Sequence, residues 1–160
     1  MHHITVSGRE KISSCESFVK PLSRRGVILD VDGTLSPEVS WTALTRRLGG
    51  SVAEHSRIFD QYRHGEISYV ESRIQLIGLW QSSGNASRQN FLDIFESFTL
   101  RPGAISLVVE LEAAGFELCI ITGSFDLYAQ SVATKLGVRN FYANTPLYFQ
   151  MEKSKATITR

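Results

Sequence analysis

The chain has 160 residues, of which 42% are hydrophobic and 21% are charged, with 17 Lys and Arg against 16 Asp and Glu. This length and apolar content suffice to bury one core, so a globally disordered chain is excluded. The near-neutral charge disfavours a nucleic-acid-binding protein, which usually carries a basic excess. No apolar run approaches the roughly 20 residues of a membrane-spanning helix, so no membrane partner is expected.

Two cysteines, Cys15 and Cys119, lie far apart in the chain and form no metal-type pair. A disulfide scaffold is therefore excluded, and we expect a reducing, cytoplasmic environment. Residues 1–25 carry five basic and two acidic residues and lack an apolar segment of the signal-peptide type. We expect a flexible N-terminal extension here, with a basic targeting peptide as the alternative.

The first expected strand is the apolar run at residues 27–29, which ends in a glycine-containing turn. Between residues 40 and 98 the pattern becomes helical, and we expect about four helices and no strand there. Ser51 and Ser68 are each followed three residues later by a glutamate, which is the capping-box spacing of a helix start. Helical spacing also predicts buried stripes that contain Leu44, Leu48, Ile74, Ile77 and Trp80.

The second half of the sequence alternates helices with strands. We expect a helix that buries Leu107, Val108 and Leu111, then a strand at residues 116–121, a helix at 127–136 and a strand at 141–143. Residues 148–150 are predicted as one arm of a short hairpin or as an edge strand. This alternation predicts an α/β fold with a Rossmann-like parallel sheet, right-handed crossovers and a site at the carboxyl ends of the strands.

Two aspartates follow the first expected strand. Asp30 and Asp32 are two residues apart, so an extended backbone directs both carboxylates to the same side. Adjacent carboxylates repel each other unless a cation lies between them or one is protonated. Mg²⁺ would remove the repulsion, one carboxylate could attack phosphorus, and the other could act as general acid and base. A solvated turn with an aspartate as helix cap is the alternative.

A second polar cluster follows the strand at residues 116–121. Thr122 offers a hydroxyl group, and Gly123 and Ser124 offer N–H groups at a helix start, which together suit phosphate oxygens. Gly33 and Thr34 form a turn whose N–H groups can also approach an anion. Ordinary helix capping is the alternative for the Thr-Gly-Ser segment.

The two clusters together resemble motifs of a known family. Residues 27–35, Val-Ile-Leu-Asp-Val-Asp-Gly-Thr-Leu, resemble the first motif of the haloacid dehalogenase superfamily of phosphohydrolases, and residues 120–124 resemble the second. The helical stretch between them matches the position of that family's small cap, and residues 60–69 are similar to the phosphoserine-phosphatase-like branch. The resemblance implies an α/β core at residues 26–36 and 100–160 and a helical cap at residues 37–99.

The resemblance also implies roles for individual residues. Asp30 would be the nucleophile that becomes phosphorylated, and Asp32 would be the general acid and base. The Asp30 carboxylate and the Asp32 backbone carbonyl would hold Mg²⁺. Thr122 and Gly123 would bind the transferring phosphoryl group, and the cap would close over a small phosphorylated metabolite.

The family pattern is only partly present. Its third motif contains a lysine, and its fourth contains one or two aspartates that complete the magnesium shell. After Ser124 the acidic residues are Asp126 and Glu152, and neither stands in such a motif, while Lys153 and Lys155 fall where the family has a hairpin turn. We therefore expect a core that is incomplete at its C-terminal end.

The substrate is not set by the motifs. Phosphoserine phosphatases have serine where this chain has Gly33, and a glutamate nine positions after the nucleophile, whereas Glu38 is eight positions on. Another small phosphomonoester is therefore as plausible a substrate as phosphoserine. Arg63 and Arg73 could contact a substrate anion, or could simply be surface residues. We expect Trp41, Tyr62, Tyr69 and Trp80 to form the cap core and not a ligand cage.

Three functions follow from these observations. The first is a magnesium-dependent phosphomonoester hydrolase that acts through an aspartyl-phosphate at Asp30. The second is a truncated, weakly active or inactive remnant of the fold that binds only phosphate or a partner chain, which the missing acidic motif favours. The third, a receiver-like phospho-acceptor domain, is disfavoured by the long helical insertion after Leu35.

Overall fold

The computed structural model describes residues 25–149 and 156–157. Three parallel strands form its sheet, in the order β1 (Arg25–Leu29), β2 (Phe116–Phe125) and β3 (Asn140–Thr145). The described helices are α1 (Ser40–Arg47), α2 (Val52–Arg63), α3 (Tyr69–Ser82), α4 (Arg88–Ser97), α5 (Ala104–Ala113) and α6 (Asp126–Leu136). The predicted α/β fold with a parallel sheet is therefore confirmed.

Two of the predictions concern the ends of the chain. Residues 148–150 were expected to form a hairpin arm, and a two-residue strand β4 (Tyr148–Phe149) does pair antiparallel with β5 (Ala156–Thr157). The expected N-terminal extension lies outside the described residues apart from Arg25, which begins β1. Cys15, Glu152, Lys153 and Lys155 also lie outside the described residues.

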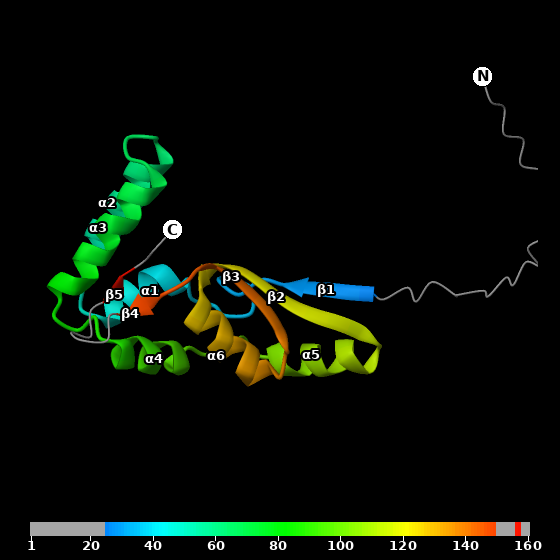
Figure 1. The fold of residues 1–160 in the computed structure, drawn as a ribbon. Coiled ribbons are helices and arrows are strands. Elements are labelled where there is room, and N and C mark those ends of the chain that lie inside the picture. The colour runs from blue at the N-terminus through cyan, green and yellow to red at the C-terminus, as the bar shows by residue number, and fades with distance from the viewer. Residues whose placement is uncertain (1–24, 150–155, 158–160) are drawn as a thin grey trace, which may run out of the picture.

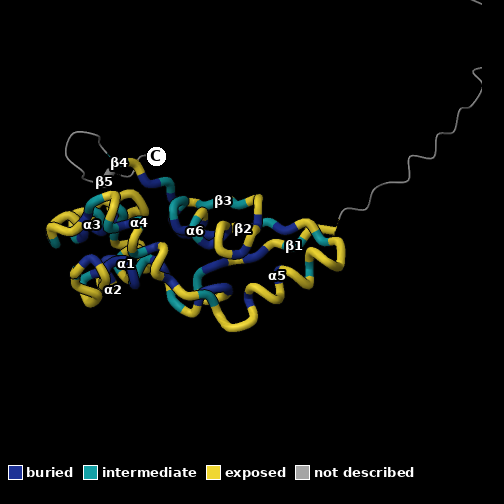
Figure 2. Tube along the Cα trace, turned by 90° about the horizontal axis from the view of Figure 1, so that it is seen from below, coloured by how far each residue is buried: buried dark blue, intermediate teal, exposed yellow. Residues whose placement is uncertain are grey.

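Both crossover helices cover the same face of the sheet. α5 packs on β2, α6 packs on β2 and β3, and Figure 1 shows the two helices together beneath the strands. Leu29, Leu118 and Ile120 point toward these helices and are buried, whereas Ile28 and Tyr142 point to the opposite face and are each 68% exposed. Figure 2 shows the buried stretches along the strands and the exposed turns of α5 on the outside.

Four helices, α1 to α4, lie between β1 and α5 in the chain, as the sequence predicts. Both predicted helix starts are confirmed, because the Ser51 and Ser68 side chains accept the backbone N–H groups of Glu54 and Glu71. α2 and α3 pack against each other and project from the rest of the molecule (Figure 1). We refer to α1–α4 as the helical insertion.

Two positions of the predicted helix stripes are wrong. Ile74 is 62% exposed because the buried face of α3 is formed by Ser72, Leu76 and Trp80, which follow one another at intervals of four residues. Leu107 of α5 is also exposed, while Ala104 and Val108 are the buried residues of that helix. In both helices the observed face is shifted around the axis from the predicted one.

An aromatic cluster joins the helical insertion to the sheet layer. Trp80 of α3 and Phe91 and Phe95 of α4 are fully buried against Phe125 and Tyr128 of the β2–α6 corner, with ring centroids 5.5–5.9 Å apart for the contacting pairs. Such ring pairs add stabilisation beyond the area they bury. The base of the insertion and the sheet layer therefore share one core. None of the described helices is long and apolar enough to cross a membrane.

Candidate active site at the carboxyl ends of the strands

The loop after β1 holds Asp30 in place. Asp30 directly follows the strand and is exposed, and the Thr34 hydroxyl donates a hydrogen bond of 3.0 Å to its carboxylate. Gly33 has a φ of +73°, which favours glycine, and this turn returns the Thr34 N–H to the Val31 carbonyl. The loop therefore fixes one carboxylate oxygen of Asp30 and leaves the carboxyl group open to solvent.

Arg101 supports this loop from the turn that precedes α5. Its guanidinium donates to the Gly33 carbonyl at 2.8 Å and to the Thr34 carbonyl at 2.9 Å. Its backbone N–H donates to the Leu35 carbonyl at 2.7 Å. The sequence indicated only a turn at residues 101–103, because nothing local to Arg101 shows that it reaches a loop 67 residues earlier.

Asp32 is bound by the first residue of α1. The Ser40 N–H and the Ser40 hydroxyl donate to its two carboxylate oxygens at 3.1 and 2.7 Å, and the Ser40 hydroxyl also contacts the Ser124 hydroxyl. Burial raises the pKa of the Asp32 carboxyl, the Ser40 hydrogen bonds partly oppose that effect, and the negative charge of Asp30 adds to it. Sequence reasoning missed Ser40, whose only signal was its position at the start of a helical pattern.

The Thr-Gly-Ser segment lies at the same edge of the sheet. The prediction that it starts a helix is wrong, because β2 continues through it to Phe125, which pairs with Thr145 of β3, and α6 begins only at Asp126. Leu29 pairs with Ile120 in the parallel register, so Asp30 and Thr122 emerge from neighbouring strands. The Thr122 hydroxyl accepts the Ser124 N–H at 3.2 Å, which leaves its own O–H free to donate. Through Ser40, the structure thus brings Asp32 of the first cluster and Ser124 of the second into one hydrogen-bonded chain.

This edge of the sheet offers two oxygen ligands for a hard cation but, in the described part of the chain, no cluster of three acidic side chains. Among residues 25–149 and 156–157 no three His, Cys, Asp or Glu side chains form a group that could hold a metal ion. The exposed Asp30 carboxylate and the Asp32 backbone carbonyl are two oxygen donors on one loop. Two protein oxygens fit Mg²⁺, which commonly binds through one or two carboxylates and keeps water and phosphate oxygens as its other ligands.

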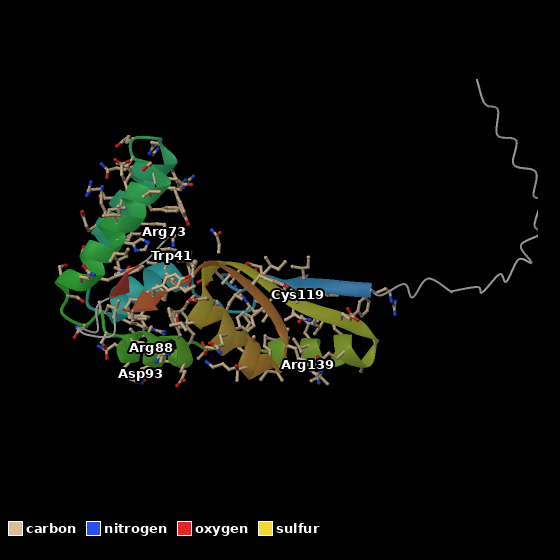
Figure 3. The ribbon with its side chains drawn as sticks, viewed as in Figure 1. Trp41, Arg73, Arg88, Asp93, Cys119 and Arg139 are labelled. Atoms are coloured by element: carbon tan, nitrogen blue, oxygen red, sulfur yellow. The ribbon has the colours of Figure 1, made fainter. Side chains whose placement is uncertain are left out.

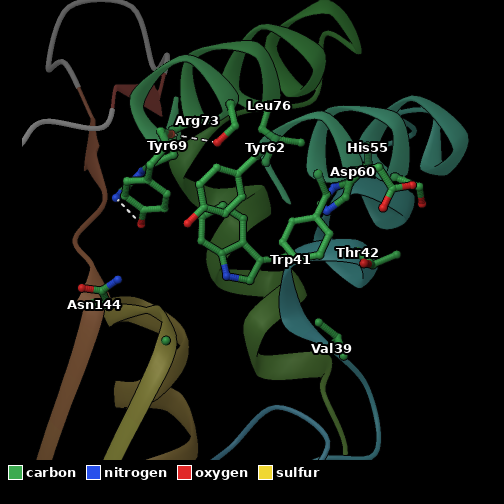
Figure 4. A pocket seen from close by; sticks show the side chains of 14 residues that line it. Val39, Trp41, Thr42, His55, Asp60, Tyr62, Tyr69, Arg73, Leu76 and Asn144 are labelled. Atoms are coloured by element: carbon green, nitrogen blue, oxygen red, sulfur yellow. Dashed lines mark hydrogen bonds between the residues drawn. The ribbon is translucent and has the colours of Figure 1, made fainter. Parts of the chain in front are cut away.

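A cavity of about 480 Å³ adjoins this edge (Figure 4). The helical insertion forms most of it, and Gly123 and Asn144 contribute from the ends of β2 and β3; Asp30 and Asp32 do not line it. Trp80 is buried in the core, as predicted. Trp41 contacts this core and also lines the cavity together with Tyr62 and Tyr69, so the prediction that these three form only a core is wrong.

The remaining predicted substrate residues differ in their positions. Each carboxylate oxygen of Glu38 pairs with an arginine, Arg46 or Arg47, at 2.6 Å. The Arg63 guanidinium lies 6.0 Å from the centre of the Phe59 ring, and Arg63 does not line the cavity. Arg73 does line it. A role in substrate binding remains a prediction for Glu38 and Arg63.

The fold and the paired aspartates at a strand end define a class of α/β hydrolases. The sequence matches the family described as haloacid dehalogenase-like hydrolase over residues 27–155, and the chain belongs to this family. Within it, the chain is similar to the phosphoserine-phosphatase-like branch.

Two curated relatives illustrate this similarity. A phosphoserine phosphatase of Idiomarina loihiensis is 25% identical over 118 residues, which are 74% of this chain and 52% of the relative. A 2-hydroxy-3-keto-5-methylthiopentenyl-1-phosphate phosphatase of Exiguobacterium sp. is 27% identical over 106 residues, 66% of this chain and 47% of the relative. The chain therefore spans about half the length of these relatives.

Solved structures show the same fold. A family hydrolase from Salmonella enterica serovar Typhi superposes with a TM-score of 0.69 at 22% identity, over 87% of this chain and 46% of that protein. A phosphoserine phosphatase solved as a phospho-aspartyl intermediate analogue superposes with a TM-score of 0.64 at 20% identity, over 84% of this chain and 63% of that protein.

Proposed function

We propose that the protein hydrolyses a small phosphorylated metabolite, a phosphomonoester, through an aspartyl-phosphate at Asp30. The observation that carries the proposal is the position of the exposed Asp30 carboxylate at the end of β1, next to strand β2, which contains Thr122 and Gly123 near its carboxyl end. A nucleophile on one strand then faces anion-binding groups on its neighbour. The family relationship supports the same reaction class.

The chain's own residues divide the reaction between them. A carboxylate oxygen of Asp30 attacks phosphorus, and the bond from phosphorus to the leaving oxygen breaks. Asp32 donates a proton to that oxygen. The raised pKa of Asp32 increases the fraction of protein molecules in which this carboxyl group is protonated and can donate. Asp32 then takes a proton from water, whose oxygen attacks the aspartyl-phosphate; inorganic phosphate leaves and the Asp30 carboxylate is restored.

The supporting groups are assigned in the same proposal. The hydroxyl of Thr122 and the N–H groups of Gly33 and Gly123 would hold the phosphoryl oxygens, because the N–H groups of Thr34 and Ser124 already donate to the Val31 carbonyl and the Thr122 hydroxyl. Asp30 and the Asp32 carbonyl would hold Mg²⁺, which when bound neutralises phosphate charge. The helical insertion, residues 37–99, would act as the cap that selects the leaving group of the substrate.

The test of this proposal is hydrolysis of 4-nitrophenyl phosphate with and without Mg²⁺. Asp30→Asn should lower kcat by at least about 1,000-fold, because the amide is a poor nucleophile. Asp93→Asn is the matched control, since Asp93 is exposed on α4 away from the cavity (Figure 3) and should leave the rate unchanged. An Asp30→Asn protein as fast as the wild type would rule out the aspartyl-phosphate.

A second function is favoured by one observation. The described residues contain no third acidic group beside Asp30 and Asp32, so a protein that only binds phosphate or a partner chain is the alternative. Beryllium fluoride mimics a phosphoryl group on aspartate. Magnesium-dependent thermal stabilisation by this complex, lost in Asp30→Asn, supports the hydrolase, whereas no turnover and no stabilisation support the binding protein.

A further inference from the structure

The cavity of the helical insertion has walls of aromatic and aliphatic side chains. Val39, Trp41, Phe59, Tyr62, Tyr69 and Leu76 line it. The Tyr62 ring centre lies 6.3 Å from that of Phe59 and 5.7 Å from that of Tyr69, so three rings follow one another along the wall. A cavity of about 480 Å³ with such walls has the size and character of a small-molecule site, and its rings suit a planar apolar group.

Arg73 supplies positive charge at one side of this cavity. One terminal nitrogen of its guanidinium donates to the Tyr69 hydroxyl at 2.8 Å, and the guanidinium lies 5.0 Å from the Tyr69 ring centre. Its Nε and its other terminal nitrogen are buried and have no hydrogen-bond partner in the described part of the chain. These two nitrogens form the edge of the guanidinium that binds a carboxylate or phosphate through two parallel hydrogen bonds, and because both are buried, the side chain has to turn toward the cavity to present them.

The other polar side chains of the cavity determine how a bound ligand would be oriented. Figure 4 shows Arg73 and Tyr69 on the side of the cavity toward Asn144, whereas Asp60 and His55 lie on the opposite side. His55 is held by Thr45 at 2.7 Å, and burial lowers its pKa, so it adds no positive charge near neutral pH. An anionic group of the ligand is therefore favoured beside Arg73 and disfavoured beside Asp60.

The cavity also reaches the proposed phosphoryl site. Gly123 lines it and stands between Thr122 and Ser124, and Asn144 follows Ala143, which pairs with Thr122. A ligand whose phosphoryl group lies at Thr122 and Gly123 would place its remaining part among the rings of the helical insertion. A small amino-acid leaving group would also offer a carboxylate to Arg73 and its ammonium group could lie toward Asp60, but it would leave the aromatic side chains of the cavity largely uncovered.

We propose that this cavity binds the leaving group of a planar, aromatic phosphomonoester that carries a second anionic group, and that Arg73 pairs with that anion. The inference rests on the proposed function for the position of the phosphoryl group. Arg73 would select for the negative charge of the ligand, and the rings of Phe59, Tyr62 and Tyr69 would select for its planar shape.

The test compares two phosphonates that cannot be hydrolysed, 4-carboxybenzylphosphonate and its neutral counterpart 4-carbamoylbenzylphosphonate. Binding to the wild-type protein is measured by titration calorimetry and by quenching of the fluorescence of Trp41, which lines the cavity. We expect the carboxylate compound to bind about tenfold or more tightly, because a charged pair with two hydrogen bonds replaces a neutral contact. Equal binding of the two compounds by the wild-type protein would overturn the proposal without any variant.

Arginine variants test whether Arg73 causes the preference for the carboxylate compound. Arg73→Gln should reduce the preference for the carboxylate below about threefold and leave binding of the carbamoyl compound within about twofold. Arg88→Gln is the matched control, because Arg88 is exposed on α4 away from the cavity (Figure 3), and it should keep the full preference. A preference that persists in Arg73→Gln, with an unchanged circular-dichroism spectrum, would overturn the assignment of Arg73.

Hydrolysis separates this proposal from the proposed function. If the protein hydrolyses 4-carboxyphenyl phosphate with a higher kcat/KM than 4-carbamoylphenyl phosphate, a neutral aryl ester with a similar leaving group, both hold. If the phosphonates show the expected preference but no phosphate ester is hydrolysed, the ligand class stands and the hydrolase function fails. If L-phosphoserine is hydrolysed and the phosphonates show no preference, the hydrolase function stands and the ligand class fails.

Discussion

His55 lies between the cavity and the core of the helical insertion. It is 5% exposed, its Nδ1 is 2.7 Å from the Thr45 hydroxyl, and the same hydroxyl accepts the indole N–H of Trp80 at 2.7 Å. Buried polar groups linked in this way are stable only while each donor meets an acceptor. Burial lowers the pKa of His55 because the imidazolium form loses hydration.

The lowered pKa makes the protein less stable in acid. The folded state binds fewer protons than the unfolded state once the pH falls below about 6.5, so the free energy of unfolding decreases from there through the folded-state pKa. Urea unfolding at pH 7.5 and 5.5 should show this decrease, and His55→Gln should make it smaller. The exposed residue His64 offers the control His64→Gln, which should keep the wild-type dependence. A decrease of the same size in His55→Gln would contradict the assignment.

The N-terminal part of α3 provides side chains that line the cavity. Tyr69 and Arg73 both belong to this helix, whose start is fixed by a reciprocal pair of hydrogen bonds. The Ser68 hydroxyl accepts the Glu71 N–H at 3.2 Å, and the Glu71 carboxylate accepts the Ser68 N–H at 2.7 Å. These bonds satisfy two backbone donors that a helix start otherwise leaves unpaired, so the capping box orders the turn that positions the guanidinium.

Ser68→Ala should destabilise the protein by about 1 kcal/mol, the usual cost of losing an N-cap hydroxyl. Chemical denaturation measures the change. Ser82→Ala, at the other end of α3, removes a hydroxyl that donates only to the Leu79 carbonyl, and should change stability by less than about 0.5 kcal/mol. Equal effects of the two substitutions would show that the capping box contributes nothing specific.

At the scale of the whole molecule, one face of the sheet differs from the other. α5 and α6 lie on the same side, and no helix of the described part of the chain lies on the side of Ile28 and Tyr142 (Figure 1). Ile121, from the central strand, is 45% exposed on that open face. Neighbouring exposed apolar groups on a sheet are a surface to which other apolar molecules bind.

The open face should bind the dye 8-anilinonaphthalene-1-sulfonate (ANS), measured with 4-carboxybenzylphosphonate in excess so that the Arg73 cavity is already occupied. Replacing Ile28 and Tyr142 by threonine keeps residues suited to a strand and should reduce the dye's fluorescence by roughly half or more. Ile74→Thr is the control, because Ile74 is similarly exposed but lies on α3, and it should reduce the signal little. Dye binding that is unaffected by the double substitution would locate the accessible apolar surface elsewhere.

Local patterns in the sequence were enough to predict much of the architecture. The aspartates after a short apolar strand, the Thr-Gly-Ser segment and the caps at Ser51 and Ser68 depend on neighbouring residues, so their positions can be inferred without the fold. The parallel pairing of β1 and β2 follows from the alternation of strands and helices, and it accounts for the meeting of the two polar clusters at one edge.

Contacts between distant segments lay beyond such inference. Ser40 joins Asp32 to Ser124 across 84 residues, and Arg101 reaches a loop 67 residues earlier. Ile74 faces outward because Ser72, Leu76 and Trp80 form the buried face of α3. The cavity likewise depends on how three helices meet two strand ends, which places Arg73 and Asn144 on the same side of it. Spacing along a helix shows which residues share a face, but the partner that covers that face is chosen by packing of the whole chain.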